Sequence, residues 1–253
     1  MGGQKMKTEK TIQTAVPLPL AHAYNVRDIG CYRGRNGEKL REGRFLRSDA
    51  LGRLDDREWQ FLKDYGVTLI VDLRSPKERE QEPFKQQAEA AGICYQSVPM
   101  FDNIQSNDGS EEFPASLHEL YIRILDKNRD QIREVLRKFL KNEEGCCLFN
   151  CTAGKDRTGV IAMLLLGLAD VEEDTIIADY SVSAENMRPL FEGQIRAMEE
   201  AGYGNLRFLL ESDPEDMRIT LRFLKERYGN ARKYVRNLLT EEEVKRLEGM
   251  LAG

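Results

Sequence analysis

Residues 146–168 read CCLFNCTAGKDRTGVIAMLLLGL, and this stretch decides the fold. It begins with a short apolar run typical of a buried strand and ends with an apolar run typical of a buried helix. Small and charged residues lie between the two runs, Gly154 among them. α/β proteins build anion sites from a strand, a tight loop and a helix, because the loop amides and the helix N-terminus carry positive partial charge.

The segments around this stretch alternate between strand-like and helix-like patterns. Residues 67–74 and 93–100 are β-rich apolar runs, whereas residues 117–125 and 132–140 repeat apolar residues at helical spacing. Only helical patterns follow residue 171. This order predicts an α/β fold with a central, largely parallel sheet flanked by helices on both faces, and a helical C-terminal third.

The domain organisation follows from proline positions and from the absence of a linker-like segment. Pro17 and Pro19 disfavour a helix near the N-terminus. We therefore expect residues 1–20 to form an extended arm and residues 21–253 to form a single domain.

Composition excludes several classes of partner and cofactor. The 253 residues carry 38 basic and 43 acidic side chains. Because basic side chains are not in excess, we do not expect a nucleic-acid partner. The sequence contains no run of 18 apolar residues, so we do not expect membrane insertion. The two histidines and five cysteines show no metal-ligand spacing, so we expect neither a metal nor another cofactor. The odd cysteine count favours a reducing compartment.

The location follows from the first residues of the chain. They lack the apolar core of a Sec signal, which predicts a cytoplasmic protein and leaves secretion by another route open. We expect a monomer.

Two kinds of phosphate-binding loop could be built here. A Walker loop would need glycine five residues before Gly154, where Phe149 stands, and serine or threonine after Lys155, where Asp156 stands. The nucleotide-loop interpretation therefore fails.

The second kind of loop is the spacing Cys-x5-Arg, from Cys151 to Arg157. Amides around a cysteine stabilise its thiolate, and a guanidinium can hold a phosphate through two parallel hydrogen bonds. This pattern predicts transfer of a phosphoryl group to Cys151, followed by hydrolysis. The predicted phosphate-binding residues are Thr152, Ala153, Gly154, Lys155, Asp156, Arg157 and Thr158.

The stretch CTAGKDRTG resembles the signature loop of the cysteine-dependent tyrosine phosphatase superfamily. It is most similar to the bacterial branch that contains the secreted mycobacterial tyrosine phosphatase B. NVRDIG at 25–30, FLRSDAL at 45–51 and DLRSPKERE at 72–80 resemble landmarks of that branch in the same order. The resemblance covers roughly residues 20–250. It implies a phosphotyrosine phosphatase-like fold, a phosphocysteine intermediate and a phosphorylated protein as substrate.

One position departs from the pattern of this superfamily. Histidine usually precedes the nucleophile, whereas this chain has Asn150. That histidine orients the loop in the superfamily, so the difference implies a weakened or retuned enzyme. A pseudophosphatase that binds phosphorylated ligands without turnover stays open as an alternative.

Two aspartates are candidates for the general acid that protonates the leaving group. Asp156 lies in the loop, at a position implicated in proton donation in the resembling branch. Asp102 follows a predicted strand, where related dual-specificity enzymes carry their mobile acid. Asp72 and Arg74 close another strand and could contact substrate, orient the loop or form a structural ion pair.

The substrate also has two readings. Lys155 resembles the loop lysine of lipid-acting phosphatases, which makes a phosphoinositide an alternative substrate. Because a phenol leaves more easily than an alcohol, phosphotyrosine is the first expectation.

Overall fold

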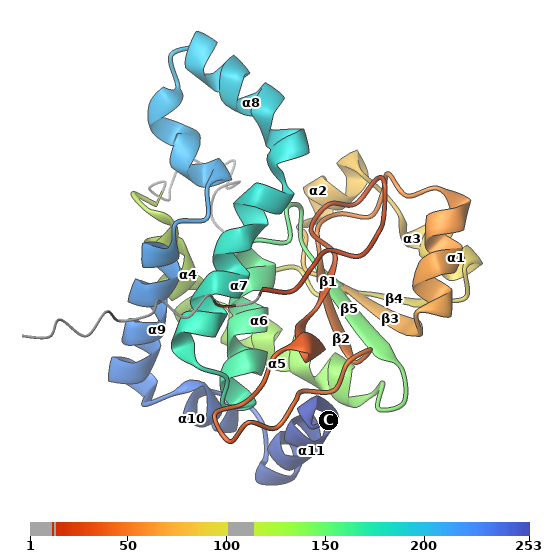
Figure 1. Ribbon diagram of the computed structural model, residues 1–253, viewed down its shortest axis with the longest axis vertical. Coiled ribbons are helices and arrows are strands. Elements are labelled where there is room, and N and C mark those ends of the chain that lie inside the picture. Colours follow the sequence, from red (N-terminus) through yellow and green to blue (C-terminus); the bar gives the residue numbers. More distant parts are fainter. Residues whose placement is uncertain (1–11, 13, 101–113) are drawn as a thin grey trace, which may run out of the picture.

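A five-stranded sheet forms the centre of the computed structural model, which describes residue 12, residues 14–100 and residues 114–253 (Figure 1). The strands lie in the order β1-β2-β5-β3-β4. All neighbours run parallel except β1, which pairs antiparallel with β2 at one edge. The strands are β1 (Arg27–Asp28), β2 (Phe45–Ser48), β3 (Val67–Asp72), β4 (Cys94–Ser97) and β5 (Cys146–Asn150). The predicted largely parallel sheet is confirmed.

Strand β5 lies in the middle of the sheet and is buried on both faces. Cys146 and Leu148 belong to one apolar core, whereas Cys147 and Phe149 belong to the other. Side chains alternate between the faces of a strand, so a strand covered on both sides is apolar throughout. This explains the uninterrupted apolar run at the start of residues 146–168.

The smaller core lies under α1 (Asp56–Asp64) and α3 (Lys85–Ala90). Asp55 caps α1, and Glu58 completes a capping box with it. The short helix α2 (Pro76–Gln81) precedes α3 and begins at a second capping box. Between them lies Pro83, which cannot donate a backbone hydrogen bond to a continuing helix.

The larger core lies on the opposite face of the sheet, and α6 (Asp156–Leu168) runs through it (Figure 1). Nearly every side chain of α6 is buried, which its apolar sequence predicts. The helices around it are α4 (Leu117–Lys127), α5 (Arg129–Leu140), α7 (Glu173–Asn186), α9 (Pro214–Tyr228), α10 (Ala231–Arg236) and α11 (Glu241–Leu251). The helical C-terminal third is confirmed. A 3-10 turn, η1 (Ile29–Cys31), follows β1.

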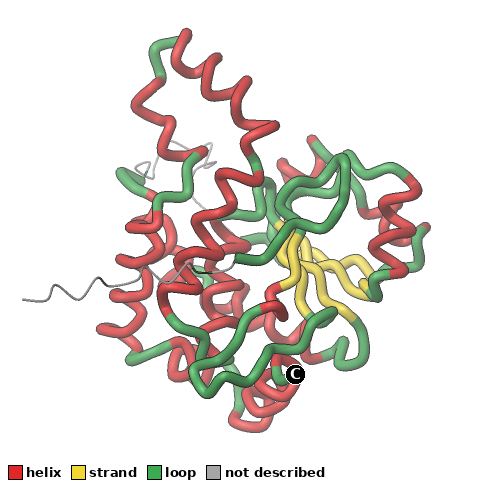
Figure 2. The backbone as a smooth tube through the Cα atoms, viewed as in Figure 1, coloured by secondary structure: helices red, strands yellow, loops and turns green. Residues whose placement is uncertain are grey.

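One helical arm extends beyond the rest of the molecule, at the top of Figures 1 and 2. It consists of α8 (Arg188–Glu200) and the 3-10 helix η2 (Gly204–Leu210). The chain returns at Ser212, whose hydroxyl donates to the Ser181 carbonyl oxygen at 2.7 Å and accepts from the Ala184 amide at 2.9 Å. Both ends of the arm are therefore fastened to α7.

None of the helices in the described part of the chain combines the length and apolarity that crossing a bilayer requires.

The loops after the parallel strands converge at the carboxyl edge of the sheet. The Leu73 amide donates to the Asn150 carbonyl at 2.8 Å, and the Ala50 amide donates to the Thr152 carbonyl at 3.1 Å. Ligand sites of open α/β sheets form at this edge. The loop that starts at Cys151 is thus enclosed by the loops after β2 and β3.

Candidate active site

Cys151 is the first residue after β5 and begins a five-residue loop that ends where α6 starts. Its side chain is buried, and it is a free thiol. The residue before α6 is Lys155, whose side chain makes no capping hydrogen bond. An uncapped helix of this length presents its first N–H groups and the positive end of its dipole to the loop. The thiol therefore lies next to a concentration of backbone donors.

Hydrogen bonds to the carbonyls fix the direction of the loop amides. Asn25 Nδ2 donates to the Ala153 and Gly154 carbonyl oxygens at 2.9 and 3.2 Å. Arg47 donates to the Gly154 carbonyl at 2.7 Å. The carbonyl and N–H of a trans peptide point in opposite directions. Because the two carbonyls are held outward, the amides of Gly154 and Lys155 are held on the other side of the loop.

Gly154 is required for this turn. Its φ of +65° is the left-handed region, which L side chains rarely adopt. A Cβ at this position would lie 2.5 Å from the Ser48 carbonyl carbon. The loop can pack against the end of β2 only because this residue has no side chain.

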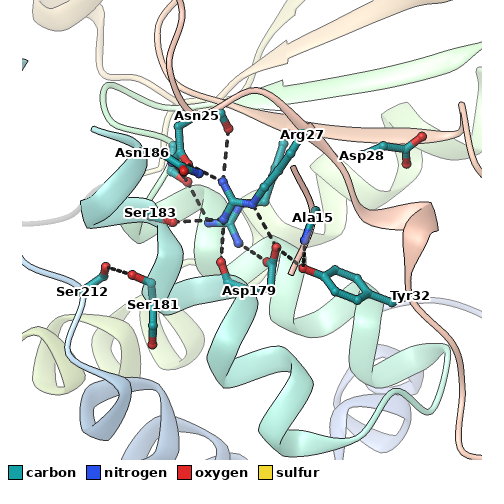
Figure 3. A network of polar contacts seen from close by, with 12 residues as sticks. Ala15, Asn25, Arg27, Asp28, Tyr32, Asp179, Ser181, Ser183, Asn186 and Ser212 are labelled. Atoms are coloured by element: carbon teal, nitrogen blue, oxygen red, sulfur yellow. Dashed lines mark hydrogen bonds and ion pairs between the residues drawn. The ribbon is translucent and has the colours of Figure 1, made fainter. Parts of the chain in front are cut away.

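A buried ionic network supports the residues that hold the carbonyls (Figure 3). Asp179 of α7 accepts from Arg27 Nε at 3.0 Å, from Arg47 at 2.5 Å and from the Tyr32 hydroxyl at 2.9 Å. Burial raises the pKa of Asp179, but the two arginines outweigh it and lower the value to about 2. The carboxylate therefore stays charged and keeps both guanidiniums in place.

Asn25 is the point where this network meets the loop. Arg27 donates to the Asn25 side-chain oxygen, and Asn186 at the end of α7 donates to the same oxygen at 3.0 Å (Figure 3). Its amide nitrogen is then directed at the loop carbonyls. The motif NVRD at 25–28 thus buttresses the loop, while Asp28 binds the Gly30 and Gly43 amides in a separate turn.

Arg157 is held by Glu78, the third residue of α2. Its two terminal nitrogens donate to the two carboxylate oxygens at 2.7 and 2.6 Å, and both side chains are buried. The Thr152 hydroxyl donates to the same carboxylate. Burial raises the pKa of Glu78, yet its hydrogen bonds and the charge of Arg157 lower it to about 2. The guanidinium plane is thereby fixed beside the loop.

Lys155 lies at the end of the loop and is directed at the base of the helical arm. Its ammonium donates to the Leu209 carbonyl at 2.7 Å and to the Glu211 carbonyl at 2.6 Å. The side chain is 1% exposed. The prediction that this ammonium contacts phosphate receives no support from these contacts, since the backbone of residues 209–211 binds it instead.

Asp156 is the first residue of α6, and its carboxylate accepts a hydrogen bond from the Tyr121 hydroxyl of α4 at 2.7 Å. The side chain is 19% exposed, unlike the fully buried Tyr121. The structure thus places one of the two candidate acids directly after the loop, partly open to solvent. The other, Asp102, lies outside the described residues.

Thr158 and Asn150 flank the loop and are both fully buried. Within the described residues, the Thr158 hydroxyl has no hydrogen-bond partner. Asn150 donates from Nδ2 to the Cys151 carbonyl at 3.3 Å. Asparagine therefore supports the first turn of the loop at the position where the superfamily has histidine.

Asp72 and Arg74 form a buried ion pair with a bond of 2.8 Å. Tyr95 also donates to Asp72, and Arg74 stacks on the Phe84 ring at 4.5 Å from its centroid. Every one of these contacts lies within β3, β4 and the segments around α2. The geometry therefore favours a structural ion pair over contact with substrate.

The sequence alone does not identify four residues as members of the site: Glu78, Arg47, Asp179 and Tyr121. Two of them fall in quoted landmarks, Arg47 in FLRSDAL and Glu78 in DLRSPKERE. Charged residues inside those landmarks were the available signal, but their partners could not be deduced from local spacing.

Comparison with known proteins assigns the chain to a family. A family model described as "Tyrosine phosphatase family" matches residues 18–253. A tyrosine-protein phosphatase of Nostoc commune is 32% identical over 218 residues, 81% of this chain and 72% of the relative. The triple specificity protein phosphatase PtpB of Mycobacterium tuberculosis is 27% identical over 281 residues, 92% of this chain and 98% of the relative.

Among solved structures, the crystal structure of Pseudomonas aeruginosa TpbA has a TM-score of 0.37 and 14% identity, and covers 60% of this chain and 80% of its own. That likeness is too distant to add to the assignment.

Proposed function

This chain belongs to the tyrosine phosphatase family and is an enzyme of the protein-tyrosine-phosphatase type, and from that premise we propose that it hydrolyses phosphotyrosine esters through a phosphocysteine at Cys151. One observation carries the proposal. The carbonyls of Ala153 and Gly154 are held outward by Asn25 and Arg47, so the amides of Gly154 and Lys155 lie on the other side of the loop, where backbone donors can bind an anion.

The reaction takes two steps. The Cys151 thiolate attacks phosphorus, an S–P bond forms, and the bond from phosphorus to the leaving oxygen breaks while that oxygen receives a proton from a general acid. Water then attacks phosphorus, the S–P bond breaks, and the carboxylate recovers a proton from the water. Arg157 and the loop amides stabilise the negative charge on the phosphoryl oxygens in both steps.

We assign the acid to Asp156. It immediately precedes Arg157. Its carboxyl is 19% exposed and lies 3.4 Å from the Lys155 ammonium, whereas that of Asp72 is fully buried in a 2.8 Å ion pair with Arg74. Asp102 is the competing candidate, and Asp102→Asn provides the comparison. The true acid is the residue whose amide variant slows release of a basic leaving group more than release of an acidic one.

Phosphotyrosine is the substrate class that the site supports best. The argument for a phosphoinositide rests on the Lys155 charge, and that ammonium is bound to the Leu209 and Glu211 carbonyls. The name of the PtpB relative, a triple specificity protein phosphatase, supports testing further phosphate esters beside phosphotyrosine, with the phosphoinositide alternative among them.

Hydrolysis of p-nitrophenyl phosphate in the presence of EDTA tests the proposal. We expect turnover by the wild type, none by Cys151→Ser, and unchanged turnover by the control Cys147→Ser. Cys147 is a suitable control because it is buried in β5, and burial raises the pKa of its thiol to about 11. Vanadate binding without turnover in the wild type would instead select the pseudophosphatase alternative.

A further inference from the structure

Two tyrosine hydroxyls and one carboxylate form a chain that ends at the loop. Tyr121 of α4 donates to Asp156 Oδ1 at 2.7 Å, and the Tyr121 and Tyr180 hydroxyl oxygens are also 2.7 Å apart. The two rings meet edge to face, with centroids 5.6 Å apart. Both tyrosines are almost completely buried, at 0% and 1% exposure. Neither is part of the signature loop.

The number of hydroxyl hydrogens fixes which group donates in each hydrogen bond of this chain. A carboxylate can only accept, so the single hydroxyl hydrogen of Tyr121 is committed to Asp156. Tyr180 of α7 must then be the donor in the pair of tyrosines. Burial and the nearby Asp156 charge raise the pKa of both phenols well above the ordinary value, so both hydroxyls keep their hydrogens.

The contacts on the Asp156 carboxyl are one-sided. Within the described residues, the Tyr121 hydroxyl and the Lys155 ammonium, at 3.4 Å, both approach Oδ1. With Oδ1 held from α4 and from the loop, the Oδ2 oxygen is the one left to carry a transferable proton.

More distant charges act on Tyr180. Arg47 and Asp216 of α9 influence Tyr180, and Asp216 is itself engaged by His118 at 2.8 Å. Among the described residues, the groups in contact with the carboxyl itself are the Tyr121 hydroxyl and the Lys155 ammonium.

We propose that Tyr121, supported by Tyr180, is a positioning residue that holds Asp156 by Oδ1 and leaves Oδ2 as the proton donor to the leaving oxygen. This inference rests on the proposed function, in which Asp156 is the general acid. Neither tyrosine transfers a proton, and both remain neutral throughout. Displacements of a reacting group by about 1 Å can cost on the order of a hundredfold in rate, so a fixed carboxyl matters to catalysis.

Leaving-group dependence separates such a role from plain packing. The measured quantity is kcat/KM, which reports steps up to formation of the phosphoenzyme, for p-nitrophenyl phosphate and phenyl phosphate. The two esters have similar size, but phenoxide is the more basic leaving group and needs the proton more. The variants are Tyr121→Phe, Tyr180→Phe, Asp156→Asn, the double variant Tyr121→Phe/Asp156→Asn, and the control Tyr234→Phe.

Tyr234 is a matched control because it is also fully buried and its hydroxyl donates to the Leu125 carbonyl of α4 at 2.6 Å. We expect Tyr121→Phe to lose roughly tenfold on phenyl phosphate and no more than about twofold on p-nitrophenyl phosphate. Tyr180→Phe shows the same selectivity with a smaller loss, and it carries the test if Tyr121→Phe fails to fold. In the Asp156→Asn background, Tyr121→Phe adds no further loss.

Two outcomes would overturn the inference in distinguishable ways. Equal losses on the two esters, or a further loss in the Asp156→Asn background, would make Tyr121 a packing residue and leave the acid assignment standing. If Asp156→Asn itself shows no selective loss on phenyl phosphate, the acid assignment fails, and the role of Tyr121 fails with it. Loss of turnover in Cys151→Ser tests the phosphocysteine step independently of both.

Discussion

The pairing of Arg157 with Glu78 places two opposite charges in a buried site, at 4% and 6% exposure. Each ion has a desolvation cost of several kcal/mol, which only close contact and full hydrogen bonding can offset. The two bonds of 2.7 and 2.6 Å and the bond from Thr152 supply that compensation. Removing one partner leaves the other charge buried without its counterion, so this pair couples the stability of the fold to the orientation of the arginine.

Glu78→Gln is predicted to weaken both properties. The free energy of unfolding at neutral pH should fall by about 3 kcal/mol, because the Arg157 charge loses its buried partner. kcat/KM should fall roughly tenfold or more, because the guanidinium is no longer fixed beside the loop. Urea unfolding and p-nitrophenyl phosphate hydrolysis measure the two effects. Glu80→Gln, an exposed position on the same helix, should change neither, and an unaffected Glu78→Gln would show that the pair is dispensable.

Gly154→Ala is predicted to displace the backbone amides of the loop. Alanine at φ +65° has a strain of roughly 1–2 kcal/mol, and its Cβ would collide with the Ser48 carbonyl group. We expect weaker inhibition by vanadate, by roughly tenfold or more, because the loop must move to relieve the contact. Gly37→Ala has a similar φ of +82° with nothing within 4 Å, so it isolates the strain from the collision. Unchanged vanadate inhibition in Gly154→Ala would contradict the packing argument.

Local spacing predicts some of these residues and not others. Cys151, Gly154 and Arg157 follow one another within a strand-loop-helix unit, so their proximity is a property of the chain itself. The partners Glu78 and Asn25 lie 79 and 128 residues away from the groups that they bind. The sequence predicts that Asn25, Arg27 and Asp28 form a turn that buttresses the site, but only the packing of the segment before β1 shows which loop carbonyls Asn25 binds. Only the packing of α2 against the loop reveals Glu78.

Helices and strands could be predicted from the sequence where burial makes apolar residues recur at a fixed spacing. The apolar faces of α4 and α5 and the two-sided burial of β5 appear directly in the sequence pattern. The same pattern makes Tyr121 look like an ordinary core position of α4. Its hydroxyl meets Asp156 only because α4 packs across α6, a tertiary relation that periodicity does not encode.

Lys155 connects two elements, the loop before α6 and the segment after η2. Lys155→Met is predicted to loosen the base of the helical arm, because two backbone carbonyls lose a charged donor. Hydrogen exchange measured by mass spectrometry should become faster in residues 204–213. Lys245→Met, an exposed position in α11, serves as the control and should leave that exchange unchanged. Equal exchange in the wild type and Lys155→Met would show that this contact does not hold the arm.

Among the described residues, two buried carboxylates have a pKa lowered to about 2, and a third buried carboxylate, Asp49, has a raised pKa. Glu78 and Asp179 each have a pKa of about 2, because paired arginines outweigh the effect of burial. Asp49 has a pKa raised to about 6, since burial outweighs the hydrogen bonds from Asn25, Tyr24 and Arg53. These shifts make the stability of the fold depend on pH in two opposite ways.

Acid should destabilise the protein through the first two groups. Their unfolded-state pKa values are near 4, so their contribution is complete above about pH 4.5 and is lost as the pH falls towards 2, each on the order of 2–3 kcal/mol. Urea unfolding between pH 2 and pH 5 measures this slope, and Glu78→Gln should reduce it. An identical slope in the variant would contradict the role of Glu78.

Asp49 contributes in the other direction. The native state binds its proton more tightly than the unfolded state does, so stability should fall as the pH rises from about 4 to about 6. Asp49→Asn should remove that fall. A decline of the same size in the variant would assign it to another group.

The phosphocysteine is the central claim, and trapping it is the most direct test. The wild type is mixed with a phosphotyrosine peptide, the reaction is quenched in acid within the first turnover, and the phosphorylated residue is identified by mass spectrometry. We predict phosphate on Cys151, with more of it in Asp156→Asn if water attack is slowed more than phosphoryl transfer. Phosphate on another residue, or sustained turnover with no phosphoenzyme at any quench time, would contradict the mechanism.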